Sequence, residues 1–233
     1  MYMVVQAGVI TARIQEEARK RGLLYAGDPC SGDCCCIGGN GATNAGGNRA
    51  VKYGTTRDQI YAIEVVTPTG QIAHLGKRLH KMTAGYPLEK IVIGSEGTLG
   101  IITELTLKLV PLLRATAHVL AVFPSPETAL ALVTALPKAG ITPTCLEFMD
   151  YDVISVVQDW LKEKQPCPAG GAYMIIQLDS SRDETLDDDC VAVDEVCRRL
   201  GAVDVFMADA DKVWKARKAF TEASAADCPC LLY

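Results

Sequence analysis

The chain has 233 residues, of which 49% are apolar and 22% are charged. This composition is typical of a protein that buries a core, and it excludes intrinsic disorder and collagen-like repetition. The formal net charge is −5, which argues against nucleic acid as the main partner because phosphate binding draws on a basic face. The length holds one large domain or one and a half small ones.

The hydropathy pattern predicts neither a transmembrane segment nor an export signal. The mean hydropathy of +0.15 is high for a soluble protein, yet no apolar run approaches the ~18 residues needed to cross a bilayer. The N-terminus lacks a basic segment followed by a long apolar stretch. A cytoplasmic location is therefore expected.

The first half of the chain mixes strands with glycine-rich turns. Residues 23–58 show neither helical nor strand periodicity, and a loop of that length inside a compact domain is usually functional. The expected elements, in chain order, are a strand at 3–7, a helix from Thr11 as N-cap to Gly22, a long loop over 23–58, a hairpin of strands 60–67 and 71–75, and an alternating strand at 101–109.

After Pro111 the pattern changes to regular strand–helix alternation, which predicts a separate α+β layer and a domain boundary near residues 110–116. The expected elements are a strand at 117–123, a helix capped by Ser125 and ended before Gly140, a strand at 144–149, a helix over 150–164, a strand at 172–179, a helix at 183–200, a strand at 202–207 and a helix over 209–225.

Ten cysteines are present, and Cys30, Cys34, Cys35 and Cys36 lie close together. Without an export signal they do not indicate a set of disulfides. Structural metal sites space their ligands as C-x2-C to C-x4-C, usually in two pairs, and the second pair is missing here. We therefore expect reduced, mostly buried thiols, with a zinc or iron–sulfur module as the alternative.

The sequence lacks the usual signatures of hydrolases. His74, His80 and His118 stand in unrelated segments, and neither a G-x-S-x-G elbow nor a Walker loop is present. A hydrolase built on a histidine triad or on a metal is therefore not expected.

One segment exposes an unusual amount of unsubstituted backbone. Its glycines allow close approach of a ligand, and successive N–H groups in such a loop can converge on a phosphate. The alternative is a tight connector that binds nothing. A Rossmann site fails because Asn44 takes the third glycine position. The segment comprises Gly38, Gly39, Gly41, Gly46 and Gly47, with Asn40, Thr43 and Asn44 between them.

A second glycine cluster occupies residues 94–100 and carries one carboxylate, Glu96. That carboxylate could accept hydrogen bonds from a ribose or from backbone amides. Two such loops on either side of a hairpin suit an extended ligand with phosphates at one point and a ring system at another.

These two segments carry a resemblance to a known family. IGGNGATNAGGNRAVKYGTTRD (37–58) and AGYPLEKIVIGSEGTLGIITE (84–104) resemble the FAD-linked 2-hydroxyacid dehydrogenases. This is the D-lactate, glycolate and D-2-hydroxyglutarate branch of the vanillyl-alcohol-oxidase type flavoproteins. The match is strong from Val4 to Pro111 and continues diffusely to Ala226, including LEFMD at 146–150.

The resemblance implies an α+β fold. The C-terminal part of a PCMH-type FAD-binding domain would span residues 1–112. Part of a ferredoxin-like α+β cap, the FAD-linked oxidase C-terminal domain, would span 113–226, followed by a divergent tail at 227–233. Pro87 stands where the family usually has Asp, and the family's upstream phosphate loop and downstream histidine segment are both missing. The chain is therefore expected to be the middle of a longer enzyme.

The resemblance also implies noncovalent FAD and a set of contact residues. In relatives, an Arg and a Thr one helical turn apart hold the substrate carboxylate, which points to Arg217 and Thr221. The alternative is that Arg217 is an ordinary surface helix residue. The cofactor contacts would be Pro29, Gly32, Gly38, Gly39, Asn40, Thr43, Asn44, Gly46, Gly47, Tyr53, Gly54, Glu96, Gly97, Gly100 and Ile102.

The implied reaction is oxidation of a D-2-hydroxy acid to a 2-oxo acid by hydride transfer to the flavin. The electrons would pass to a flavoprotein, quinone or cytochrome. No residue of this chain is assigned as catalytic acid or base, because the family's histidine segment is missing. The alternative is a non-catalytic flavin-binding fragment that needs a complementing chain, or that acts as a homo-oligomer. The substrate acid and the acceptor are left open.

Overall fold

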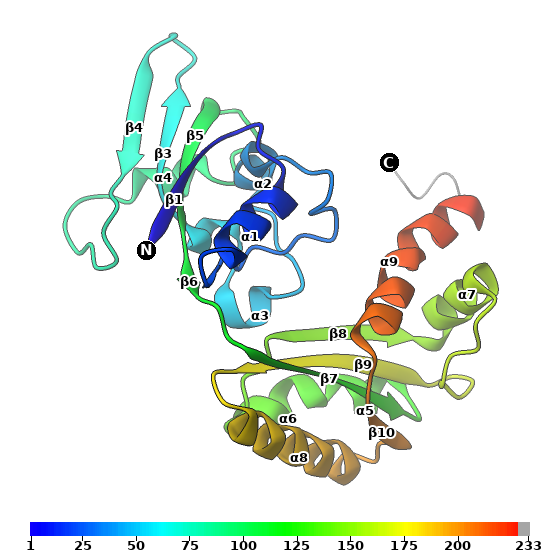
Figure 1. Ribbon diagram of the computed structural model, residues 1–233. Coiled ribbons are helices and arrows are strands. Elements are labelled where there is room, and N and C mark those ends of the chain that lie inside the picture. The colour runs from blue at the N-terminus through cyan, green and yellow to red at the C-terminus, as the bar shows by residue number, and fades with distance from the viewer. Residues whose placement is uncertain (228–233) are drawn as a thin grey trace. The chain divides into compact units, whose positions relative to one another are not determined.

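A computed structural model of the chain describes residues 1–227, and Figure 1 shows its elements. The chain divides into two compact units, Met1–Leu112 and a second that begins at Leu113. In the described part of the chain, no helix is long and apolar enough to span a membrane.

The first unit is built on a four-stranded antiparallel sheet in the order β1-β5-β3-β4. A small β2–β6 pair lies apart from it. Its elements are β1 (Tyr2–Gln6), α1 (Thr11–Arg19), β2 (Leu23–Leu24), α2 (Ile37–Thr43), α3 (Ala50–Tyr53), the 3-10 turn η1 (Thr56–Gln59), β3 (Ile60–Val66), β4 (Ile72–Gly76), α4 (Leu88–Val92), β5 (Ile101–Lys108) and β6 (Val110–Pro111).

The core of the first unit lies between this sheet and helices α1 and α2. The alternation expected at 101–109 places Leu105 and Leu107 on the buried face of β5. Ile14 of α1 and Ile37 of α2 pack against them. Burying each of these side chains contributes about 1.5–3 kcal/mol, so α2 is anchored by its first residue.

The second unit has an antiparallel sheet in the order β10-β7-β9-β8. Counted from its own first strand this is 4-1-3-2, the ferredoxin-like order, with α7 added between the second and third strands. Its elements are β7 (Ala115–Phe123), α5 (Pro126–Leu130), α6 (Leu132–Lys138), β8 (Cys145–Asp150), α7 (Tyr151–Leu161), β9 (Ala172–Ser180), α8 (Asp183–Arg199), β10 (Asp204–Met207) and α9 (Ala210–Asp227).

Both faces of the second sheet are covered. Helices α5, α6 and α8 pack on one face, and α7 and α9 on the other (Figure 1). Because β7 and β9 are central and buried on both sides, they are almost continuously apolar, as such strands usually are. The strands and helices expected after Pro111 are confirmed within a few residues, except that the helix expected between Ser125 and Gly140 is divided into α5 and α6. Ser125 caps α5 through its side chain.

Two expectations about residues 1–58 are wrong. The segment 23–58 is not one long loop, since it contains α2, α3 and η1. Glycine costs a helix about 1 kcal/mol relative to alanine, so the glycine-rich sequence does not predict α2. Tertiary contacts stabilise this helix. Thr11 is not an N-cap either, because Ile10 holds that position. The buried Thr11 hydroxyl instead accepts from Asn40 Nδ2 at 2.8 Å.

The expectation of mostly buried cysteines is also wrong. Of the cysteines in residues 1–227, only Cys145 and Cys197 are buried, whereas Cys30, Cys34 and Cys36 are exposed. Three adjacent positions in a surface turn cannot all point into a core. Cys228 and Cys230 lie outside the described residues.

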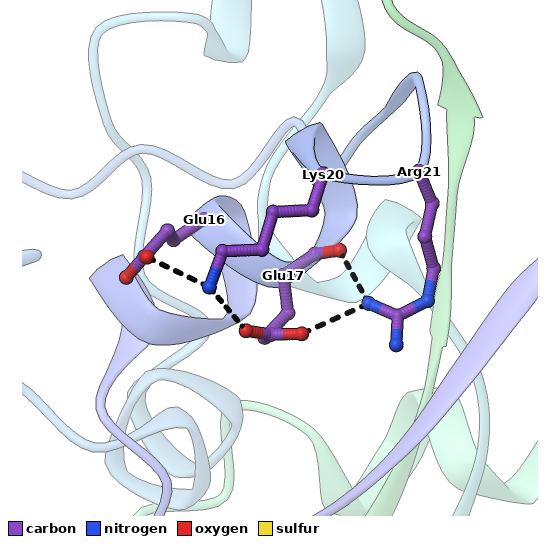
Figure 2. A network of polar contacts seen from close by, with 4 residues as sticks. All are labelled: Glu16, Glu17, Lys20 and Arg21. Atoms are coloured by element: carbon purple, nitrogen blue, oxygen red, sulfur yellow. Dashed lines mark hydrogen bonds and ion pairs between the residues drawn. The ribbon is translucent and has the colours of Figure 1, made fainter.

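The outer face of α1 carries a network of exposed charges (Figure 2). Lys20 Nζ lies 2.9 Å from Glu16 Oε1 and 2.7 Å from Glu17 Oε1, and Arg21 Nη1 lies 2.9 Å from Glu17 Oε2. The hydrogen bonds from Lys20 and Arg21 lower the pKa of Glu17. Because every member is exposed, the network contributes little to stability.

Candidate functional site

The two glycine-rich segments lie against each other, although about fifty residues separate them. Gly94 N donates to Gly41 O at 3.0 Å, and Glu96 N donates to Ala42 O at 2.9 Å. The turn that precedes β5 is therefore bonded to the end of α2. The contact forms because β5 returns antiparallel beside β3 and packs under α2.

Arg57 connects the same two segments. Its backbone N–H donates to Asn44 Oδ1 at 2.8 Å, and its Nη2 donates to Ile93 O at 2.7 Å. Asn44 itself has a left-handed backbone with φ 50°. Arg57 was not singled out from the sequence, because a single arginine in the motif GTTRD carries no local sign of a contact 36 positions away.

A third contact brings the turn at Pro29 and Gly32 to the end of the first glycine segment. Asn48 N donates to Asp28 O at 3.1 Å, and Arg49 Nε lies 3.4 Å from Asp28 Oδ2. Gly47 is required here, since its φ is +136° and a Cβ would lie 2.3 Å from Asp28 O. Arg49 Nη1 is buried without a hydrogen-bond partner.

Several of the candidate glycines are required by packing within the first unit. A Cβ on Gly38 would lie 2.6 Å from Ala7 Cβ, and one on Gly41 would lie 3.2 Å from Leu105. Gly54 and Gly100 have positive φ. A Cβ would lie less than 3 Å from Asp58 at Gly54 and from Val66 at Gly100. Internal packing alone therefore accounts for these positions.

Gly39 and Gly46 are different, because the fold gives no reason for glycine at either. Both are exposed, neither has a positive φ, and a Cβ on either would meet nothing within 4 Å. Gly97, although it has φ +78°, also faces open space. Bare backbone next to open space is what a closely approaching ligand requires, so these residues fit an extended cofactor such as FAD.

The remaining candidate cofactor residues lie around this surface in different ways. Asn40 is buried and its side chain donates to Thr11, so it faces the core. Thr43 Oγ1 donates to Gly39 O within α2 at 3.0 Å. Ile102 is buried beneath Gly41. Glu96 is exposed, and Tyr53 ends α3 before Gly54.

The candidate substrate residues belong to the second unit. Arg217 lies on α9, and its Nε donates to Glu147 Oε2 of β8 at 2.8 Å. The two side chains are 26% and 19% exposed, so the pair is largely shielded from water. Thr221 follows one turn later on α9, but its side chain lies outside what the structure describes. Glu147 was not expected as a partner of Arg217 from the sequence.

The surroundings of this pair are aromatic. Trp214, one turn before Arg217, meets the His118 ring edge-on at a centroid distance of 6.2 Å. Burial raises the pKa of Tyr173 on β9, and the nearby Arg217 charge partly offsets that rise. A guanidinium in such a setting suits a carboxylate ligand. Among residues 1–227, no three His, Cys, Asp or Glu side chains converge as metal ligands.

Comparisons with known proteins place this geometry in a class of flavoproteins. Residues 1–76 match the model described as FAD binding domain, and residues 112–230 match FAD linked oxidases, C-terminal domain. The chain belongs to the family of FAD-linked oxidases. The resemblance inferred from the glycine motifs, the α+β fold and the FAD cofactor are thereby confirmed.

Similar proteins include a D-lactate dehydrogenase of Anaerostipes hadrus, which is 40% identical over 96% of this chain and 49% of its own length. The glycolate oxidase subunit GlcD of Bacillus subtilis is 38% identical over 89% and 44%. A D-2-hydroxyglutarate dehydrogenase of Xanthomonas citri is 32% identical over 97% and 49%. The chain thus spans about half the length of the curated relatives it matches.

A solved structure of alkyldihydroxyacetonephosphate synthase shares the fold. Its TM-score is 0.75 at 23% identity, and the alignment covers 97% of this chain and 43% of that chain. At that identity the likeness concerns the fold alone.

Proposed function

We propose that the first unit holds FAD noncovalently along the exposed backbone of the two glycine-rich segments. This proposal rests on the hydrogen bonds that join residues 41–42 to residues 94–96. They hold together the two segments that carry the open positions Gly39, Gly46 and Gly97. In this proposal Pro29, Gly32, Tyr53, Gly54 and Glu96 also contact the cofactor. Gly38, Asn40, Thr43, Asn44, Gly47, Gly100 and Ile102 hold the shape of the two segments.

The proposed reaction is oxidation of a D-2-hydroxy acid, of the D-lactate, glycolate or D-2-hydroxyglutarate class, to the 2-oxo acid. The D-lactate dehydrogenase, glycolate oxidase and D-2-hydroxyglutarate dehydrogenase among the relatives support this class. The oxidation removes a hydride from C2 and a proton from the hydroxyl oxygen. FAD, when bound, supplies the chemistry by accepting that hydride.

In this proposal Arg217 binds the substrate carboxylate, and Thr221 adds a hydrogen bond from the next turn of α9. Glu147 fixes the guanidinium through Nε, which limits the rotamers that the long side chain can adopt. A positioned guanidinium holds a carboxylate with defined geometry, so substrates lacking a carboxylate would bind weakly. Among residues 1–227, none is assigned to the proton transfer.

We assign residues 1–112 to part of a PCMH-type FAD-binding domain and residues 113–226 to part of the FAD-linked oxidase C-terminal domain. The division of the chain between Leu112 and Leu113 supports this assignment. The tail at 227–233 begins at the last described residue. Electrons would leave to a flavoprotein, quinone or cytochrome acceptor.

FAD titration of the purified chain tests the cofactor proposal. Quenching of FAD fluorescence on binding, with release of intact FAD by acid precipitation, is expected. A chain that leaves free FAD fluorescence unchanged, or that retains flavin after acid, contradicts it. The reaction is tested separately with D-lactate, glycolate and D-2-hydroxyglutarate and a dye acceptor. Flavin-loaded protein that reduces dye with none of them contradicts the reaction but leaves FAD binding intact.

The second candidate is a flavin-binding chain that turns over only with a complementing polypeptide or as a homo-oligomer. It is supported by the relatives' lengths, because the chain covers 49% of the Anaerostipes hadrus enzyme. FAD binding without dye reduction by the chain alone is the result that would distinguish it from the first candidate.

A further inference from the structure

The four clustered cysteines occupy a tight surface turn directly before α2. Gly32 N donates to Pro29 O at 2.9 Å, Cys34 N to Ser31 O at 3.0 Å, and Cys35 N to Ser31 O at 2.8 Å. These successive bonds, to the third and fourth residues back, coil the backbone as in a helical turn. Residues four apart in such a coil lie on the same side.

The backbones of two of the four cysteines are held by the surrounding structure. Cys35 is half-buried, its carbonyl accepts from Thr11 N at 3.1 Å, and its Sγ lies 3.4 Å from Thr11 Oγ1. Cys36 is extended, with φ −89° and ψ 144°, and its backbone pairs with Ile10. Both are therefore tied to the start of α1.

Cys30 and Cys34 are the remaining two. Both are exposed, as is Cys36, but only Cys30 and Cys34 are four residues apart within the coiled turn. Cys30 Sγ lies 3.6 Å from Asn48 Oδ1, and Cys34 Sγ lies 3.4 Å from Ser31 O. Helical spacing puts Cβ atoms four residues apart about 5–6 Å from each other, whereas a disulfide needs about 3.5–4.5 Å. Because the turn is exposed, the two Cβ atoms can approach by that difference without disturbing a core.

We propose that Cys30 and Cys34 are a modification site, a dithiol that a hydroperoxide oxidises reversibly to a disulfide. Hydrogen peroxide oxidises one thiol to a sulfenic acid and releases water. The second thiol then attacks that sulfur, the S–S bond forms, and the sulfenic oxygen leaves as a second water. The two thiols lose two electrons in total, which reduce the peroxide. A dithiol reductant reverses the reaction by thiol–disulfide exchange.

The disulfide affects the surface proposed for FAD, and this consequence rests on the proposed function. Closing the turn moves Cys30 away from Asn48, which follows Gly46 and Gly47. The same turn contains Pro29 and Gly32. If the oxidised turn binds FAD more weakly, bound FAD must by the same factor disfavour the disulfide at equilibrium, because binding linkage is reciprocal.

Peptide mapping identifies the disulfide directly. A protease that cleaves before aspartate cuts ahead of Asp28, Asp33 and Asp58, so Cys30 falls in peptide 28–32 and the other three cysteines in 33–57. After peroxide treatment and thiol blocking, we expect the two peptides joined, and separate after reduction. A disulfide within 34–36 leaves them separate and overturns the proposal.

Two serine variants identify the partner of Cys30. Cys34→Ser is expected to abolish the joined peptides, and the matched variant Cys36→Ser is expected to keep them. Joined peptides that persist in Cys34→Ser overturn the assignment. Both substitutions are at exposed positions, and circular dichroism checks that each variant folds.

FAD affinity tests the consequence. Oxidised protein is expected to bind FAD at least about tenfold more weakly than reduced protein, with recovery after reduction. In a dithiol redox buffer, saturating FAD is expected to shift the Cys30–Cys34 equilibrium toward the dithiol by the same factor. Equal affinities in the two redox states overturn the link to FAD. If reduced protein binds no FAD, both the proposed function and the link between the disulfide and FAD are wrong. The joined peptides then still show whether the Cys30–Cys34 disulfide forms.

Discussion

Arg217 Nε donates to Glu147 Oε2 across 2.8 Å, which joins helix α9 to strand β8 seventy residues away in the chain. Each side chain is about three-quarters buried or more. A charge in such a place needs a partner, because removing one member leaves the other desolvated and unpaired. The pair therefore both stabilises the second unit and orients the guanidinium.

Mutating this pair should reveal a measurable coupling. In a double-mutant cycle of Glu147→Gln and Arg217→Gln, we expect a coupling energy of about 1 kcal/mol, reduced from fully buried values because water reaches both groups. Both tryptophans, Trp160 and Trp214, lie in the second unit, so their fluorescence follows its unfolding in urea. The exposed pair of Asp194 and Arg198 on α8 of the same unit is the control, for which a coupling below about 0.5 kcal/mol is expected. Equal couplings in the two pairs would show that the burial of Arg217 has no effect.

Gly39→Ala should separate ligand binding from folding. The new methyl group meets nothing within 4 Å, and alanine favours a helix over glycine by about 1 kcal/mol, so α2 should become more stable. The same methyl group projects where FAD is proposed to lie. We expect a higher melting temperature together with FAD affinity reduced about tenfold.

Gly47→Ala is the matched contrast to Gly39→Ala. Its φ of +136° and its contact with Asp28 O at 2.3 Å exclude a side chain, so this variant should lose about 1–3 kcal/mol of stability. The two melting temperatures should move in opposite directions. A lower melting temperature in both variants would mean that Gly39 is required by the fold.

Arg57→Lys should loosen the connection between the two glycine segments. Lysine cannot reproduce the planar donor that reaches Ile93 O. We expect a loss of about 1 kcal/mol, the usual net value of one hydrogen bond. Hydrogen exchange should be faster at the amides of Gly94 and Glu96, which donate to α2. Unchanged exchange at these two amides in Arg57→Lys would show that the backbone bonds alone hold the segments together.

Alkaline pH should destabilise the second unit through Cys197. Burial, aided by Asp194, raises the pKa of this thiol from 9.0 to about 12. The unfolded chain thus releases the proton at lower pH than the folded chain, so this contribution is present below pH 9 and is lost as the pH rises toward 12. The slope approaches about 1.4 kcal/mol per pH unit.

Cys197→Ala is the variant that tests this effect. Unfolding followed by tryptophan fluorescence between pH 9 and 10.5 should show a shallower decline in stability for Cys197→Ala than for the parent chain. Parallel declines in the parent and Cys197→Ala would assign the alkaline sensitivity to other groups, such as the buried Tyr173.

Local patterns predicted the elements whose signal lies in neighbouring residues. The alternation of Leu105 and Leu107 predicted β5, and Ser125 followed by Pro126 predicted the start of α5. Helix α2 was missed because its glycines oppose helix formation, and burial of Ile37 outweighs that local preference. The cysteine turn was misjudged because the sequence does not show which side of a coiled turn faces solvent.

The order of the two glycine-rich motifs carried the resemblance from which the FAD-linked oxidase family was predicted, whereas the glycine content alone left a connector that binds nothing as an alternative. Only the tertiary structure decided which glycines serve packing and which face open space, because that depends on Ala7, Asp28 and Val66 arriving from elsewhere in the chain. It also showed that Arg57 pairs with the carbonyl of Ile93 and Arg217 with the carboxylate of Glu147. Such pairings join residues far apart in sequence, and their geometry exists only after the sheets have formed.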